Sequence, residues 1–208
     1  MKTNHTMKNL KKAAMFFMIA AGVLTGCKKE EDEDPHAEHE HEVMTDVTLT
    51  FTNQSDPSDV VAVLAQDPDG EGVEALKVIG SIDLDTSKSY RLTIQIANNL
   101  ESPGEDIGAE VAEEDDEHQV FFSFNSNAFT NPAGDGNIDN ASDAIDYNDI
   151  DGNGNPLGLS TDWATTSATL TGGTFRVVLV HQPGVKTGSS TVNDGDADFD
   201  LQFVLNIK

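Results

Sequence analysis

Histidines and carboxylates are the residues of this chain with the most chemical potential. The 208 residues include 6 histidines, 37 acidic residues and one cysteine, Cys27. Imidazole and carboxylate groups together suit zinc and other borderline divalent metals, whereas carboxylates and amides on a glycine-containing turn suit calcium. The sequence shows no nucleophile elbow and no glycine-rich phosphate loop after a strand. We therefore expect a metal-binding protein and no enzyme.

The first predicted site joins two histidines at the ends of two predicted strands. Counting by two along each strand puts His118 and His181 on the core-facing side. One strand begins at His118 and another ends at His181, so antiparallel pairing would bring both rings to the same end of the fold. With Glu114 or Glu117, they would form a zinc-type site. The alternative is a pair of structural histidines, each hydrogen-bonded at a strand end.

The second predicted site is the run from Asp149 to Asn155, which reads D-I-D-G-N-G-N. It matches the opening of a calcium loop, with Asp149, Asp151, Asn153 and Asn155 as oxygen ligands. The twelfth position of that loop is Ser160 instead of glutamate, and no helix is evident on either side. A plain turn of Asx and glycine residues is therefore the alternative interpretation.

The third predicted site lies in a low-complexity segment, residues 27 to 45. His36, His39 and His41 alternate there with glutamates, a pattern that can capture zinc or copper transiently. The segment has almost no apolar side chains, so we expect it to be a disordered acidic tether. The alternative role for the three histidines is simple solubility.

The N-terminus is typical of a bacterial lipoprotein signal peptide, which we place at residues 1 to 26. Lysines precede the apolar stretch Ala13 to Thr25, which is too short to span a bilayer comfortably. The stretch ends in L-T-G-C, so Cys27 is the predicted lipidation site and the mature first residue. Translation could begin at Met1 or at Met7, since either opens a normal signal peptide.

The lysines and the acidic run that follow Cys27 resemble the surface-export tag of lipoproteins in Bacteroidota-type Gram-negative cells. The resemblance implies a lipid-anchored protein on the outer face of the outer membrane. The alternative is a solvated tether whose charges keep it extended. The expected partners are the membrane, through the lipid, and divalent cations; an outer-membrane transporter is a further candidate.

The formal net charge of −25 excludes an ordinary nucleic-acid-binding protein, because the phosphate backbone would repel this chain. The same field concentrates cations around the molecule. A disulfide scaffold is excluded by the single cysteine.

From residue 46 onward, apolar and polar residues alternate with period two. This pattern predicts about eight short strands in one domain, residues 46 to 208, forming an all-β, antiparallel immunoglobulin-like β-sandwich. A small β-barrel is the alternative. Gly172-Gly173 predicts a tight hairpin before Phe175. The predicted strands include Val60 to Ala65, Leu76 to Leu84, Tyr90 to Ile96, Val120 to Phe124, Thr165 to Leu170, Phe175 to Leu179 and Phe199 to Ile207.

Several motifs of the mature domain resemble those of uncharacterised Bacteroidota envelope lipoproteins, which often carry the label "type 1 periplasmic binding fold superfamily protein". The resemblance covers roughly Val43 to Lys208 and implies an envelope location, without an assigned activity or site residues. The label implies strands alternating with long helices, whereas the residue pattern here predicts strands. The motifs are E-E-x-D-E-H-Q-x-F-F (Glu113 to Phe122), G-N-P-x-G-L (Gly154 to Leu159), H-x-P (His181 to Pro183) and the terminal D-x-D-x-x-F-x-L.

These features together predict a lipid-anchored, surface-exposed envelope lipoprotein that acts as a non-enzymatic binding module for a divalent metal. The metal would be zinc at the histidines or calcium in the D-I-D-G-N-G-N loop. An adhesive or scaffolding sandwich without a specific small ligand is the alternative. A hydrolase that uses a pair of carboxylates is the third hypothesis.

Overall fold

The structure is a computed structural model that describes residues 43–70, 75–100 and 102–208. The predicted signal peptide, Cys27 and the three tether histidines lie outside the described residues, so these predictions stay predictions. Within the described ranges, no helix has the length and apolar character needed to cross a membrane.

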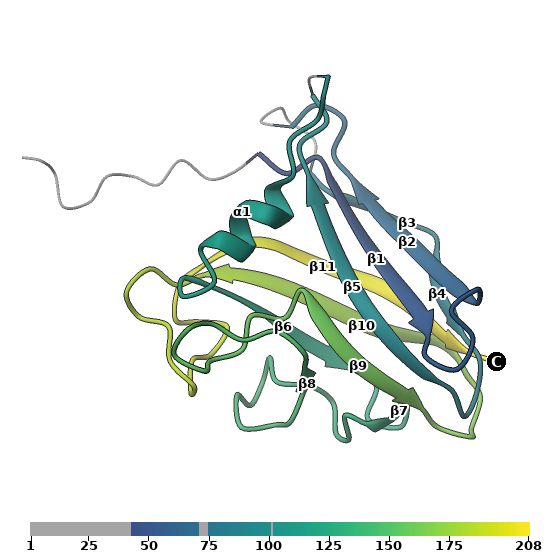
Figure 1. The fold of residues 1–208 in the computed structure, drawn as a ribbon. Helices are drawn as coiled ribbons and strands as arrows, with labels where there is room; N and C mark the ends of the chain where they lie inside the picture. The colour runs from purple at the N-terminus through teal and green to yellow at the C-terminus, as the bar shows by residue number, and fades with distance from the viewer. Residues whose placement is uncertain (1–42, 71–74, 101) are drawn as a thin grey trace, which may run out of the picture. The chain divides into compact units, whose positions relative to one another are not determined.

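One sheet has the strand order β3-β2-β1-β5-β9-β7, with β8 also paired to β9 (Figure 1). All of its pairs are antiparallel. Along β1 and β5, buried apolar residues alternate with more exposed polar ones, so one face of the sheet is buried. The bounds are β1 Asp46–Asn53, β2 Val60–Gln66, β3 Lys77–Ile79, β5 Ser89–Ala97, β7 Phe129–Asn131, β8 Asp146–Tyr147 and β9 Ser160–Thr165.

The second sheet has the order β4-β11-β10-β6 and lies behind the first in Figure 1. β10 pairs antiparallel with both β6 and β11, while β4 runs parallel to β11. Both faces of β6 are largely buried, because Phe121 packs with Val178 and Val180 on the side away from the main core. The bounds are β4 Ser81–Leu84, β6 His118–Phe124, β10 Leu170–His181 and β11 Asp196–Ile207.

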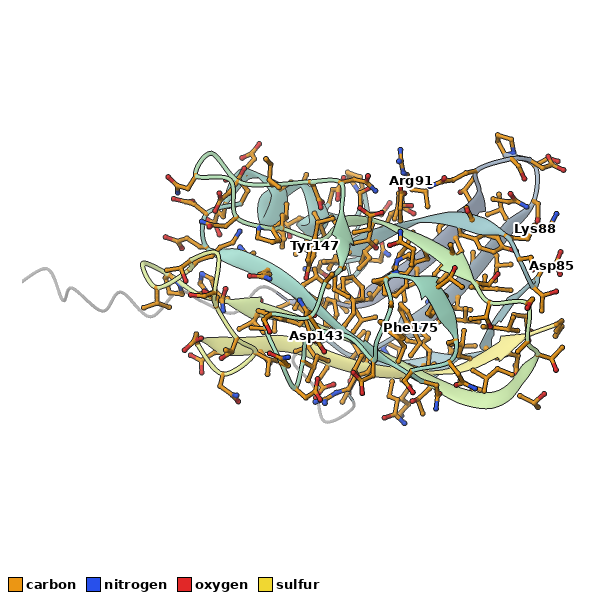
Figure 2. All side chains as sticks on the ribbon, turned by 90° about the horizontal axis from the view of Figure 1, so that it is seen from below. Asp85, Lys88, Arg91, Asp143, Tyr147 and Phe175 are labelled. Atoms are coloured by element: carbon orange, nitrogen blue, oxygen red, sulfur yellow. The ribbon has the colours of Figure 1, made fainter. Side chains whose placement is uncertain are left out.

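Aromatic side chains fill the space between the two sheets. Trp163 of β9 lies edge-on to Phe175 and Phe129, with ring centroids 4.9 Å apart in both cases, and to Phe122 and Phe124 at 5.3 Å. Edge-to-face contacts of this kind add about 0.5–1.5 kcal/mol each beyond the burial of area. Figure 2 shows Phe175 within this layer of side chains. The core therefore joins strands from both sheets.

The structure confirms the predicted all-β architecture, with two packed sheets made mainly of antiparallel pairs. The described residues contain eleven strands instead of about eight, because three of them are only two or three residues long. Such short segments leave no recognisable alternation in a sequence. The strand order does not establish the immunoglobulin-like part of the prediction.

Three predicted elements differ from the structure, two of them at glycines and one at a turn. The strand expected over Leu76 to Leu84 breaks at Gly80, whose φ of 89° lets the chain leave the first sheet and enter the second. The strand expected over Thr165 to Leu170 is a turn between β9 and β10. Gly172-Gly173 lies inside β10 and not in a hairpin. The pairing of β10 with β11 shifts between Leu170 and Gly173, as in a β-bulge.

A single helix among the described residues, α1 (Ile107–Glu113), was not predicted. The Asp106 side chain caps it by accepting a hydrogen bond from the backbone N–H of Ala109. Ile107 and Val111 are its two buried residues. One pair of apolar residues four apart is too short a signal to show helical periodicity.

Two glycines with similar φ angles should tolerate alanine very differently. Gly136 (φ 100°) would place a Cβ 2.1 Å from the Phe122 carbonyl oxygen, whereas Gly154 (φ 88°) has nothing within 4 Å. We expect Gly154→Ala to cost about 1 kcal/mol of unfolding free energy from backbone strain alone. Gly136→Ala should cost about 3 kcal/mol or more, because a clash with β6 is added. Urea unfolding measures both values, and equal losses would contradict the close approach to β6.

Candidate metal centre

His118 and His181 are directly opposite each other where β6 begins and β10 ends. Because the strands are antiparallel and both residues follow the core-facing period, both rings lie on the inner face of the second sheet. The ladder continues one bond further, since the backbone N–H of Gln182 donates to the Glu117 carbonyl at 2.6 Å. The two histidines therefore lie at one end of the sandwich, as the sequence predicts.

The two imidazole rings stack on each other. Their centroids are 4.6 Å apart and their planes differ by 10°. The His118 side chain is 3% exposed and that of His181 is 15% exposed, so one ring is covered by the other and by the protein around it. This contact satisfies the distance requirement for a shared ion, but a stack of structural histidines has the same appearance.

Three carboxylates surround the stack. Glu117 Oε2 lies 3.3 Å from His181 Nε2, and Glu114 Oε2 lies 4.0 Å from His118 Nδ1. Asp198 Oδ2, 9% exposed at its side chain, lies 3.9 Å from His118 Nε2. We call these five side chains the histidine rim.

Asp198 is the member of the histidine rim that sequence reasoning missed. It has the opposite parity to Phe199, so regular alternation would point it away from the core. The pairing of β10 with β11 shifts at this point, from Leu179 opposite Phe199 to Val180 opposite Ala197. Asp198 is therefore the extra residue of a bulge, and such a residue can be re-aimed toward a site. A bulge leaves no signal in the alternation that could have identified Asp198.

The hydrogen bond of His118 indicates which ring nitrogen carries its proton. Nδ1 lies 3.2 Å from the Glu114 carbonyl oxygen, which can only accept, so Nδ1 donates. Burial lowers the pKa of His118 below its usual value; the bond to Glu114 opposes this, and His181 adds to it. His118 is thus a neutral imidazole near pH 7 with its lone pair on Nε2, which lies 3.9 Å from Asp198 Oδ2.

The histidine rim is assembled but not closed around an ion position. One ligand atom each from Glu114, His118 and His181 lie within 4.8 Å of one another. Tetrahedral zinc with bonds of about 2.0–2.1 Å needs ligand atoms roughly 3.4 Å apart. Stacked rings also direct their in-plane lone pairs side by side instead of at one point. Binding of one ion by both rings therefore requires a rotation of at least one of them.

The predicted calcium ligands are close in space but are occupied by N–H donors. Asp149 accepts backbone hydrogen bonds from Gly158 and Ser160, one on each carboxylate oxygen. Asp151 accepts from the backbone of Asn153 and Asn155, and its Oδ2 faces a lysine ammonium at 3.4 Å. The arrangement is a tight Asx turn, so it favours the alternative interpretation of this loop; calcium binding itself stays a prediction.

One further group of possible ligands occurs among the described residues. Asp135, Asp139 and Asp143 have ligand atoms within 4.8 Å of one another, on an exposed loop after β7. Exposed acids commonly lie together without an ion, so the group by itself indicates no site. It provides a matched control, because a carboxylate can be neutralised in this group without any change to the histidine rim.

Comparisons of the chain with protein-family models, with curated proteins and with solved structures find no match in any of the three.

The metal-free protein should lose stability as the pH falls from about 6.5 toward 5. The folded-state pKa of His118 lies below the ordinary value of 6.5, so in this window the unfolded chain takes up a proton and the folded chain does not. The contribution is at most about 1.4 kcal/mol per pH unit. His118→Gln should flatten this part of the profile, as measured by urea unfolding in EDTA. Parallel profiles for the two proteins would show that burial of His118 has no such effect.

Proposed function

We propose that this protein is a lipid-anchored envelope lipoprotein whose β-sandwich binds a divalent metal of the zinc type at the histidine rim. The observation that carries the proposal is the meeting of two core-side histidines, at a ring distance of 4.6 Å, with three carboxylates within 4.0 Å of their ring nitrogens. Two imidazoles and one or two carboxylates form a donor set that suits zinc and copper better than calcium or magnesium.

The surroundings of His118 support a role as a ligand. Metal-bound histidines usually donate their other ring N–H to a carbonyl or carboxylate, which fixes the ring orientation. His118 has that bond already, to the Glu114 carbonyl. Its pKa is lowered by burial, so no proton has to leave the ring before an ion binds near neutral pH.

Closure of the site would come from the more exposed members of the histidine rim. The Glu114 side chain is 51% exposed and can swing toward the rings at little cost. The His181 and Glu117 side chains are partly exposed, which leaves them room to rotate. His118 and Asp198 form the buried wall against which an ion would bind.

Zinc titration by calorimetry tests the proposal. The untagged chain should carry alanine at His36, His39 and His41, so that the tether contributes no ligands. We expect one zinc ion per chain, and His181→Gln should weaken binding by about 100-fold or more because a direct ligand is lost. Glu114→Gln should weaken it less. Asp143→Asn, which removes an acid from the exposed Asp135 group, should leave the affinity unchanged.

The stacked geometry favours a second candidate, a scaffolding sandwich in which the histidine pair is purely structural. In that case zinc would bind with the same weak affinity before and after His181→Gln, and saturating zinc would leave the melting temperature unchanged. A ligand at a hundredfold excess over its dissociation constant stabilises a folded protein by about 2.7 kcal/mol. Failure to see that shift would reject the metal-binding function in favour of the scaffold.

The envelope location is supported by the L-T-G-C sequence and the acidic run that follows it. Several acyl chains on Cys27 would anchor the protein firmly, because each buried methylene contributes about 0.8 kcal/mol. We expect the wild-type protein in the outer-membrane fraction and Cys27→Ser outside it, as judged by cell fractionation and immunoblotting. Protease added to intact cells should degrade the wild-type protein if it faces outward. Equal fractionation of the two forms would contradict lipid anchoring.

A further inference from the structure

The Asp151 carboxylate divides its two oxygen atoms between two tasks. Oδ1 accepts the backbone N–H groups of Asn153 and Asn155, both at 2.8 Å, which holds the D-G-N-G-N turn together. Oδ2 accepts from the Asn155 side chain at 3.0 Å and faces the ammonium group of Lys186 at 3.4 Å. Oδ1 thus stabilises the turn, and Oδ2 contacts the positive charge of Lys186.

The Lys186 ammonium lies among oxygen atoms from two separate segments. It contacts Asp151 Oδ2 and donates a hydrogen bond to the backbone carbonyl of Asp115, in the acidic turn between α1 and β6. The side chains of Lys186 and Asp151 are each only 1% exposed. A carboxylate and a main-chain carbonyl are the oxygen ligands that hard cations such as calcium prefer.

The buried Asp151 carboxylate requires a positive charge beside it. Burial raises the pKa of Asp151, but hydrogen bonds from Asn155 and Asn153 and the charge of Lys186 outweigh it, so the net pKa lies below its usual value. Asp151 is therefore a buried anion. A buried charge whose partner is removed is strongly destabilising, because no solvent replaces the partner.

We propose that the Lys186 ammonium occupies the position of a divalent cation, so that the D-G-N-G-N loop is a calcium-type site filled by the protein's own side chain. Asp151, and not Asp149, is then the first carboxylate of the site. The Asp115 carbonyl provides an oxygen from across the fold. The Asn155 side chain donates its Nδ2 to Asp151 Oδ2 and so holds the carboxylate in place. The loop keeps its shape without calcium because its cation is covalently attached.

Removal of the ammonium should turn this loop into a calcium-dependent one. We expect Lys186→Ala in the full chain to lower the melting temperature by about 10 °C in EDTA, because Asp151 loses its partner. Calcium at about 1 mM, a range in which extracellular calcium modules bind, should restore most of that loss. Lys186→Met should lose similar stability without rescue, since its side chain refills the position with apolar atoms.

Two controls separate this site from the general acidity of the chain. Lys208→Met removes a lysine from an exposed pair with Asp83, whose side chains are 64% and 37% exposed, and should show no calcium response beyond that of the wild type. Adding Asp151→Asn to Lys186→Ala should abolish the rescue. Neither control changes a side chain of the histidine rim.

Three outcomes would overturn the proposal. The first is a folded Lys186→Ala protein whose melting temperature calcium does not raise more than that of the wild type. The second is a Lys186→Ala chain that cannot be recovered folded even when calcium is present throughout. The third is calcium binding by the wild type that Asp151→Asn removes, since Lys186 would then not fill the position.

Discussion

The antiparallel pairing of β6 with β10 is the constraint on which the rest of the structure depends. It places Phe122 opposite Val177 and Phe124 opposite Phe175, so the aromatic core forms along the same ladder that ends at His118 and His181. Moving the register by one residue would turn every core side chain of β6 to the other face of the sheet. The hydrophobic core therefore fixes the meeting of the two imidazole rings, and the histidine rim needs no separate device to assemble it.

A second constraint is that the many acidic side chains must be either exposed to water or paired. The chain carries a net charge of −25, and many of the acids in the part of the chain that the structure describes stay at the surface, where water screens them. Where a carboxylate is drawn inward, the structure provides a specific partner. Asp149 has backbone N–H groups, and Asp151 has the Lys186 ammonium. The acidic turn between α1 and β6 contributes to both proposed cation positions, through Glu114 and Glu117 in one and the Asp115 carbonyl in the other.

The two proposed cation positions differ in the chemistry of their ligands. The histidine rim combines nitrogen and oxygen donors, part of it exposed, and its side chains have to rotate to close on an ion. The Lys186 position has oxygen donors only, is almost fully buried, and already holds a positive charge. A soft or borderline metal from outside suits the first position, whereas the second is complete without one.

The sequence by itself determined the all-β class, the long strands and the inward phase of His118 and His181, because period-two alternation is a local property of each strand. Only the tertiary structure decided that the rings stack, that a bulge brings in Asp198, and that Lys186 reaches Asp151. Those contacts depend on register shifts and on loops that are distant in sequence, such as those of Asp151 and Lys186, which are 35 positions apart. The crossing between the two sheets at Gly80 and the short helix α1 were not predicted for the same reason. Both depend on how the whole domain packs, and no local sequence pattern indicates this.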